Sequence, residues 1–167
     1  MDDMMPTQET NGDQPSTRRP RELDPVDRKI LGLLAQNADR SFAELGELLN
    51  LSPPAVHERV KRMKRNGTIR RTVAMLDPDK VGRDLLAFVH LETSNWETTR
   101  QVLDMASLDA IEEIHTVAGD TAMILKVRTA STGALEEFLS GLHQMDGFKR
   151  VKTFVVLGTY QERGTLP

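Results

Sequence analysis

A run of positive charge interrupts a chain that is otherwise slightly acidic. Between Pro53 and Arg71, Glu58 is the only acidic residue, and seven residues are basic: Arg59, Lys61, Arg62, Lys64, Arg65, Arg70 and Arg71. Seven positive charges and one negative charge give this stretch +6, whereas the whole chain of 167 residues carries −3. Because clustered lysines and arginines attract phosphate groups, the run predicts double-stranded DNA as a partner.

Two short helices joined by a tight turn are predicted to present this run. Ser41 and Glu44 have the spacing of a capping box, which begins one helix, and Asn50 tolerates the left-handed conformation that ends it. Ser52 is the next N-cap candidate, and Pro53 takes the first helical position, where its missing N–H costs nothing. Two helices connected this closely are typical of a helix-turn-helix.

The helix after the turn has an apolar stripe and a charged face. On a helical wheel Val56, Val60 and Met63 form one stripe, which predicts that this side packs on the core of the domain. The opposite side is mostly basic, with Pro54, His57, Glu58, Lys61, Arg62 and Arg65 on its face and Arg59 and Lys64 at its margins. An earlier helix, capped by Asp24 with Pro25 at its first position, supplies the third element of the domain.

Phosphate contacts and base contacts are expected from different residues of this helix. Phosphates position a protein without revealing sequence, and they are expected to contact Arg59, Lys61, Arg62, Lys64 and Arg65. Base edges are read from the start of such a helix, where the candidates are Ser52, Pro54, His57 and Lys61. Three alternatives stay open: the charges form a merely solvated face, Ser52 is only a cap, or His57 is a plain surface residue. A minor-groove arm is a weaker candidate, from Arg18, Arg19 and Arg21.

The second half of the chain alternates strand and helix patterns. Strands are predicted at residues 85–93, 111–118, 122–129 and 151–160, and helices at residues 96–107 and 135–145. The order β-α-β-β-α-β is that of a ferredoxin-like domain with two helices on one face of the sheet. On the other face, polar residues alternate with apolar ones, as with Phe88 and His90 or Ile124 and Lys126. Pairing with a second copy of the chain would bury these apolar side chains.

The predicted fold class is α+β, with an N-terminal three-helix winged helix-turn-helix and a C-terminal ferredoxin-like βαββαβ domain. Residues 69–76 are predicted to be extended, to form the wing and to continue into a linker. The helix at 96–107 is expected to bury Val102, Leu103 and Ala106. The expected divisions are a disordered leader at 1–21, a DNA-binding domain at 22–71, a strand linker at 72–83, the sheet domain at 84–161 and a tail at 162–167.

Residue content excludes several classes of site. The chain has no cysteine, which rules out disulfides, zinc–thiolate sites, iron–sulfur clusters and cysteine nucleophiles. No metal or other cofactor is expected, because metal-ligand spacing is lacking among the four histidines, His57, His90, His115 and His143. The pairs Glu112–Glu113 and Glu136–Glu137 are expected to be solvated rather than catalytic. No stretch is typical of a signal peptide or a membrane span, which predicts a cytoplasmic protein without a membrane partner.

The chain resembles the Lrp/AsnC family of bacterial and archaeal transcription regulators over residues 22–160. The matching residues follow in order: Leu23, Asp24, Asp27, Ile30 and Leu31, then Arg40, Ser41, Glu44 and Leu45, then Leu51, Ser52, Val56, Arg59, Val60, Gly67 and Ile69, and finally Val117, Ala118, Gly119 and Asp120. The resemblance implies a DNA-reading helix-turn-helix and, over residues 84–161, a domain for effector binding and oligomerisation. It also implies dimers that assemble further, up to octamers, and an amino acid or related small molecule as effector.

The turn between the second and third strands departs from the family pattern. Family members usually have Gly-x-x-Asp there, whereas in this chain Gly119, Asp120 and Thr121 are followed by Ala122. By the resemblance, these four residues are the candidates for effector binding. An acid that could hold an effector's ammonium group is missing at Ala122 unless Asp120 replaces it, so the effector could differ from the usual amino acids or be lacking. Gly119 could equally be only the residue that a tight turn demands.

An enzyme is the alternative function. Sirohaem decarboxylases have a two-domain layout that resembles the one predicted here. They usually carry a His-Asn-Tyr run on the strand before this turn. Here that strand reads Glu113-Ile114-His115-Thr116-Val117, so the match fails. The charged helix is also more basic than an enzyme of this kind needs. The sequence therefore favours a regulator without catalytic residues.

Overall fold

The computed structural model describes residues 23–167, so the predicted leader at 1–21 and the arm candidates Arg18, Arg19 and Arg21 lie outside the described residues. The chain divides into two compact units between residues 72 and 73, and residues 164–167 group with the first unit. Each unit is described by itself.

The N-terminal unit contains three helices, which are α1 (Pro25–Gln36), α2 (Phe42–Leu49) and α3 (Pro53–Arg65). All three begin with the predicted caps. The Asp24 carboxylate accepts from the Val26 N–H at 2.7 Å. Ser41 and Glu44 form the capping box, in which the Ser41 hydroxyl accepts from the Glu44 N–H at 3.1 Å and the Glu44 carboxylate from the Ser41 N–H at 2.6 Å. Side chains that the sequence placed on the inner faces form the core, namely Ile30, Leu45, Val56, Val60 and Met63.

The turn between α2 and α3 is tight for two reasons. Asn50 adopts the predicted left-handed conformation, with φ 55° and ψ 47°. The Leu51 N–H then donates to the Gly46 carbonyl at 2.9 Å, which brings the chain directly over α2. A side chain at position 46 would place its Cβ 2.5 Å from the Leu51 carbonyl oxygen, closer than real Cβ atoms approach. The helix-turn-helix geometry therefore requires glycine at this position.

The predicted wing does not form in the residues that the structure describes. Residues 71–77 have no strand pairing, and the segment from 69 to 76 runs without a hydrogen-bonded neighbour strand. Ile69 packs against the core of the three helices, but Val73, Met75 and Leu76 are exposed. An extended segment becomes a strand only when a partner satisfies its backbone groups, and this single chain supplies none there. The prediction of a wing and a strand linker is wrong for this part of the chain.

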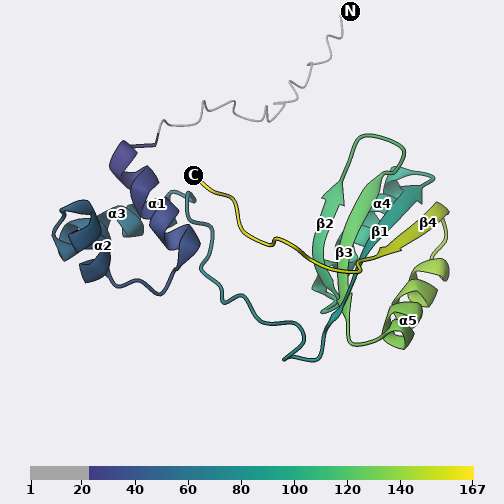
Figure 1. Cartoon of the computed structure of the whole chain (residues 1–167). Helices are drawn as coiled ribbons and strands as arrows, with labels where there is room; N and C mark the ends of the chain where they lie inside the picture. The colour runs from purple at the N-terminus through teal and green to yellow at the C-terminus, as the bar shows by residue number, and fades with distance from the viewer. Residues whose placement is uncertain (1–22) are drawn as a thin grey trace, which may run out of the picture. The chain divides into compact units, whose positions relative to one another are not determined.

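The C-terminal unit has the predicted β-α-β-β-α-β order (Figure 1). Its elements are β1 (Leu85–Thr93), α4 (Trp96–Asp104), the 3-10 turn η1 (Met105–Ser107), β2 (Ile111–Thr116), β3 (Met123–Thr129), α5 (Thr132–His143) and β4 (Phe148–Val155). The strands form one antiparallel sheet in the order β2-β3-β1-β4. The last strand was predicted at 151–160 and is found earlier, because β4 pairs with β1 from Phe148 opposite Thr93 to Val155 opposite Ala87.

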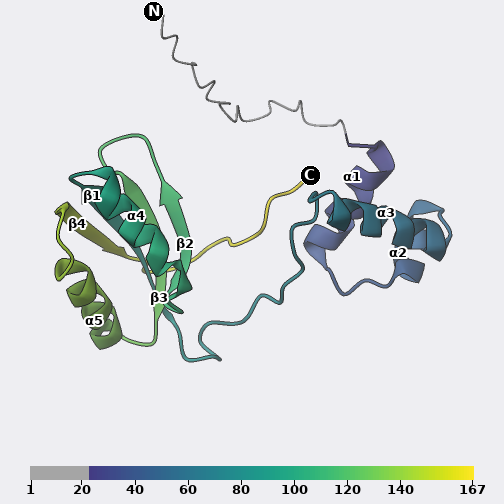
Figure 2. The same ribbon diagram turned by 180° about the vertical axis from the view of Figure 1, so that it is seen from behind.

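The two helices cover one face of this sheet, and Figure 2 shows α4 in front of the strands. Their side chains and every second residue of β1 and β3 form the core, which consists of Ala87, Val89, Leu91, Val102, Met123, Leu125, Val127, Leu135 and Leu142. Leu103 and Ala106 were expected in this core and are instead exposed. The helix tightens into η1 after Asp104, so Met105 packs on the core in place of Ala106.

Candidate nucleic-acid interface and ligand region

The helix α3 separates its two faces as the sequence predicted. Val56, Val60 and Met63 are buried against α1 and α2. Exposed positions form the opposite side, and they include Ser52, Pro54, His57, Lys61, Arg62, Lys64 and Arg65. The Ser52 hydroxyl accepts from the Ala55 N–H at 3.4 Å, so this serine is the N-cap of α3. The structure thus brings the predicted phosphate-binding and base-reading residues onto one helix, with the candidate base contacts between its N-cap and its third turn.

His57 is held by a residue that sequence reasoning missed. Its ring lies 5.2 Å from the ring of Phe42, the first residue of α2, at an angle of 50°. The His57 side chain is still 52% exposed, and its Nδ1 lies 3.8 Å from Glu58 Oε1. Phe42 is exposed at the surface, where an aromatic ring directly after the N-cap Ser41 could have drawn attention to it. The packing restricts the histidine while leaving it open to a ligand.

Arg59 and Arg62, both predicted to contact phosphates, are held by carboxylates of α1. The Arg59 guanidinium donates to Asp27 Oδ1 at 2.9 Å and lies 3.3 Å from Asp24 Oδ2. Arg62 donates to the second oxygen of Asp27 at 2.5 Å. Asp27 is 5% exposed, so its charge sits almost entirely within the domain between the two arginines. The sequence predicted none of these contacts.

These contacts shift the pKa values of Arg59 and Asp24 toward their charged forms. The hydrogen bond to Asp27 raises the pKa of Arg59 and outweighs burial, which acts the other way. The pKa of Asp24 is lowered, first by the Val26 N–H that it caps and then by Arg59. Among the described residues, no ion pair forms at Lys61, Lys64 or Arg65. Two of the seven basic residues in the run, Arg59 and Arg62, are thus paired. The other five form no ion pair with any described residue and could bind an external anion.

The four candidate effector residues lie in the turn between β2 and β3. Gly119 has φ 151°, a conformation that side chains rarely adopt, and it is exposed together with Asp120. Thr121 is engaged by the sheet, because its hydroxyl donates to the Leu91 carbonyl at 2.7 Å. The Ala122 N–H donates to the same carbonyl at 2.9 Å. Of the four candidates, Gly119 and Asp120 are therefore the most exposed, and Asp120 carries the one acidic group.

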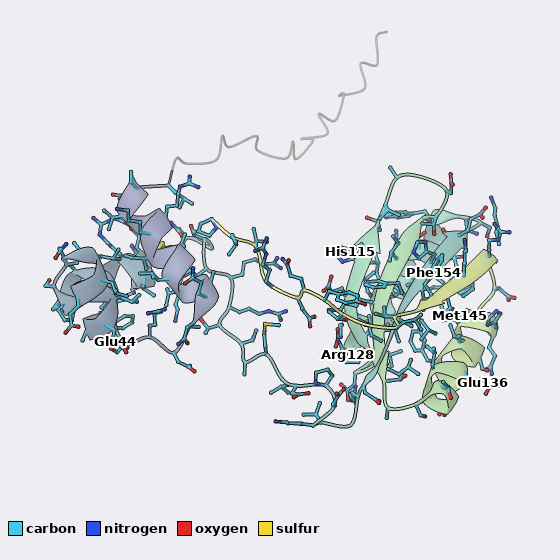
Figure 3. All side chains as sticks on the ribbon, in the orientation of Figure 1. Glu44, His115, Arg128, Glu136, Met145 and Phe154 are labelled. Carbon is cyan, nitrogen blue, oxygen red and sulfur yellow. The ribbon has the colours of Figure 1, made fainter. Side chains whose placement is uncertain are left out.

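The face of the sheet away from the helices carries a network of paired charges. Lys126 lies 3.1 Å from Glu112, 3.5 Å from Glu113 and 2.7 Å from Glu162 of the C-terminal segment. Arg128 also contacts Glu112, and Figure 3 shows Arg128, His115 and Phe154 on this sheet. Glu112 and Glu113 are exposed, as predicted, and they also form ion pairs that the sequence did not predict.

Titration of this network follows from its contacts. His115 lies 2.8 Å from Glu113, and this hydrogen bond is the main reason that the pKa of Glu113 is lowered. Burial alone would lower the pKa of Lys126, but hydrogen bonds to Glu162 and Glu112 outweigh it and raise the value. The pKa of Glu162 is lowered in turn by Lys126. The ion pairs of the network thus join two cations, Lys126 and Arg128, to three carboxylates.

Apolar and aromatic side chains surround these charges. The rings of His90 and Phe154 lie 4.9 Å apart, and the Lys152 ammonium lies 4.8 Å from the centre of the Phe154 ring. Phe88 and Phe154 are both more than one-third exposed. We call this surface, formed by Phe88, His90, Ile124, Lys126, Arg128, Lys152 and Phe154, the open face of the sheet.

Residues 23–167 contain neither a metal-binding cluster nor a membrane-spanning helix. No group of three or more histidine and acidic side chains in the described chain is arranged to hold a metal ion. No described helix combines the length and the apolar character that crossing a membrane requires.

Known proteins match both halves of the chain. Residues 23–64 match the model of the AsnC-type helix-turn-helix domain, and residues 86–166 match the Lrp/AsnC ligand binding domain. The leucine-responsive regulatory protein of Klebsiella pneumoniae is 31% identical over 158 residues, which is 90% of this chain and 95% of that protein. The HTH-type transcriptional regulator FL11 of Pyrococcus abyssi is 28% identical over 145 residues, 87% of this chain and 96% of that protein.

A solved structure agrees with these matches. The crystal structure of an AsnC family transcriptional regulator from Agrobacterium tumefaciens superposes with a TM-score of 0.80 at 26% identity, over 87% of this chain and 97% of that one. A helix-turn-helix with a basic second helix, followed by a ferredoxin-like ligand-binding domain, defines a DNA-binding transcriptional regulator. The chain belongs to the Lrp/AsnC family. The matches support this function and not the sirohaem-decarboxylase alternative.

Proposed function

We propose that the exposed face of α3 contacts DNA through a smaller set of residues than the charge run suggests. Lys61, Lys64 and Arg65 contact phosphates, and the candidates for base contacts at the start of the helix are Ser52, Pro54, His57 and Lys61. The observation that carries this proposal is the separation of buried Val56, Val60 and Met63 from exposed cations without ion-pair partners among the described residues.

The same proposal includes a dimer formed through the open face of the sheet. Its exposed Phe88 and Phe154 are the kind of aromatic side chains that interfaces between proteins bury. Two copies related by a two-fold axis would place their α3 helices in two major grooves. The two half-sites in the DNA should then lie about one helical turn, or a multiple of it, apart. Further assembly into octamers would build on this dimer.

The proposed effector is an amino acid that binds at the turn formed by Gly119, Asp120, Thr121 and Ala122. The ligand-binding model covers this turn, and the relative from Klebsiella pneumoniae is named a leucine-responsive protein. Because Ala122 has no polar side chain, the Asp120 carboxylate is the group that would hold the effector's ammonium. Binding would regulate DNA contact only through a difference in affinity for two assembly states.

The DNA contact can be tested by fluorescence anisotropy over a salt series. The probes are the DNA upstream of the protein's own gene and a scrambled duplex. Lys64→Ala should weaken binding to both probes and reduce the slope of log affinity against log salt by about 0.9, the value for one lost phosphate contact. The matched control is Lys149→Ala, an exposed lysine of β4, which should change neither. Equal effects of the two substitutions would remove α3 from the proposal.

If His57 contacts a base, its loss should affect the specific and the scrambled duplex differently. His57→Ala should weaken binding to the specific duplex by about 5- to 150-fold, the range for losing one good base contact, while the scrambled duplex is bound as before. If the protein binds the upstream DNA no more tightly than the scrambled DNA, its operator lies elsewhere in the genome. A specific probe is then obtained by selection from random duplexes. An equal loss on both duplexes would assign His57 to a phosphate.

The effector proposal is tested by isothermal titration calorimetry with each of the common L-amino acids. At least one should bind, and Asp120→Asn should weaken its binding by 10-fold or more, by the estimate of about 1.5–3 kcal/mol for a hydrogen bond to a charged group. Asp109→Asn removes a carboxylate from another exposed loop of the same domain and serves as the control. An amino acid that binds equally to the wild type and to Asp120→Asn would place the effector at another site.

A further inference from the structure

The buried carboxylate of Asp27 joins two arginines that belong to the DNA-contacting helix. Asp27 lies in the first turn of α1, and its partners Arg59 and Arg62 lie 32 and 35 residues later in α3. Each oxygen of the carboxylate accepts from a different arginine, and Asp24 adds a second carboxylate beside Arg59. Two acids thus balance two arginines at the junction of α1 and α3, which we call the Asp27 cluster.

The position of this cluster bears on how α3 contacts DNA. Arg62 lies on the same helix face as Lys61 and Arg65, and its side chain remains 48% exposed. Beside it, a pocket of about 460 Å³ is lined by Asp24, Asp27, Arg62 and Arg65 among others. Arg62 therefore has space in which to turn, and its hydrogen bond to Asp27 holds the guanidinium group toward α1. Arg59 is less exposed, at 27%, and is held by both carboxylates.

An arginine in such a pair is a weak phosphate ligand. To contact DNA it would have to leave a nearly buried carboxylate, and an unpaired charge at that site would carry a large desolvation cost. Every phosphate contact raises the affinity for all DNA alike, because phosphates carry no sequence information. If Arg59 and Arg62 do not contact phosphates, the affinity for arbitrary DNA is lower. Contacts from the start of the helix then determine which sequence is bound.

We propose that Asp27 is a specificity-determining positioning residue, which withholds Arg59 and Arg62 from phosphates so that binding to arbitrary DNA stays weak. The proposal rests on the proposed function of α3. It differs from a purely structural role, because a residue needed only for folding would reduce all DNA binding when it is changed. Loss of a residue that withholds two cations should instead strengthen binding to nonspecific DNA.

The direct test is Asp27→Asn, which keeps the shape of the side chain but removes its charge. The amide has one acceptor oxygen, so one arginine or both lose their partner. On scrambled DNA, the slope of log affinity against log salt should become steeper by about 0.9 to 1.8, for one or two new phosphate contacts. The ratio of specific to nonspecific affinity should fall at the same time. The control is Asp39→Asn, which removes the same charge from the exposed α1–α2 loop and should leave the slope unchanged.

Circular dichroism shows whether Asp27→Asn folds. If it does not fold, a second pair of variants tests the role of Asp27. Arg62→Met and Arg65→Met each remove one charge from the same face of α3 and keep most of the side-chain volume. Arg65→Met should reduce the slope on scrambled DNA by about 0.9, whereas Arg62→Met should leave it unchanged.

The outcomes separate the two proposals. Equal losses from Arg62→Met and Arg65→Met, or an unchanged or shallower slope for folded Asp27→Asn, would overturn the role of Asp27. No loss from either Arg65→Met or Lys64→Ala would instead overturn the DNA contact of α3 itself.

Discussion

The exposed face of α3 and the open face of the C-terminal sheet are both rich in charge, but they arrange it differently. On α3, Lys61, Lys64 and Arg65 form no ion pair with any described residue. On the sheet, Lys126 and Arg128 form ion pairs with the carboxylates of Glu112, Glu113 and Glu162, and the Lys152 ammonium lies over the Phe154 ring. The first face attracts a polyanion, whereas on the second face most cations already have carboxylate partners and aromatic rings lie beside them.

The difference teaches what each face can bind. Unpaired surface cations gain most from phosphates, whose counterions are released on contact. Burying charges that are already paired costs less free energy than burying charges without a partner. Burying the apolar side chains beside them in an interface is favourable. The Asp27 cluster follows the second arrangement although it lies on the first domain. It lies at the boundary between the exposed face of α3 and the side of α3 that packs on the core.

The largest expected effect concerns the helix-turn-helix alone. Gly46→Ala should lower the free energy of unfolding of the N-terminal domain by about 1–3 kcal/mol, because its Cβ would lie 2.5 Å from the Leu51 carbonyl oxygen. Gly32→Ala is the matched control, since the nearest heavy atom to its Cβ lies 3.9 Å away. That variant should instead stabilise α1 by about 0.5–1 kcal/mol.

Urea denaturation of the full chain, followed by circular dichroism and by Trp96 fluorescence, measures both variants. Trp96 lies in α4 and reports on the C-terminal domain, whose transition should not move. A Gly46→Ala protein with wild-type stability would show that the turn can relax. In that case the helix-turn-helix would not require glycine at position 46.

The second effect tests whether the open face of the sheet is an interface. Phe154→Asp should weaken self-association by about 30-fold, which corresponds to about 2 kcal/mol for the loss of a central aromatic side chain. Leu103→Asp is the control, because Leu103 is similarly exposed but lies on α4, which covers the other face. Sedimentation velocity over a concentration series measures the dimer. Equal dissociation of both variants would place the interface elsewhere.

Much of the fold could be predicted because its signals are local. The caps at Asp24, Ser41 and Ser52 lie within three residues of the groups that they satisfy. The stripe of α3 follows from helical periodicity, and strand β1 follows from its apolar run. The predicted wing failed because an extended segment such as 69–76 has no local signal for whether a partner strand exists.

The features that the sequence did not reveal depend on contacts between distant residues. Seven basic residues look alike in sequence, and only the crossing of α1 over α3 shows that Asp27 engages two of them. The same holds for Lys126, whose partner Glu162 lies 36 residues later. Gly46 is an ordinary helical glycine until the return of the chain at Leu51 is known. Periodicity identifies faces, but it does not identify which charges on a face are already paired.

The smallest effect concerns the ion pairs of the open face. Glu162→Gln should lower the free energy of unfolding of the C-terminal domain at pH 7 by less than about 1 kcal/mol, because Glu162 is largely solvated and water screens the pair. Lys126 lowers the pKa of Glu162 in the folded protein below its ordinary value of 4.5. The stabilisation is therefore present above pH 4.5 and is lost as the pH falls through the lowered pKa.

Urea denaturation between pH 7 and roughly pH 2.5 checks the sign of this effect. The wild type and Glu162→Gln should differ at pH 7 and converge at the acid end, where Glu162 of the folded wild type becomes protonated. Glu136→Gln removes a carboxylate from α5 that has no ion pair among the described residues, and it should match the wild type at pH 7. A difference for Glu162→Gln that stays constant with pH would mean that the side chain acts through packing. The charges of the open face would then not be balanced by pairing, and the contrast with α3 would lose its electrostatic basis.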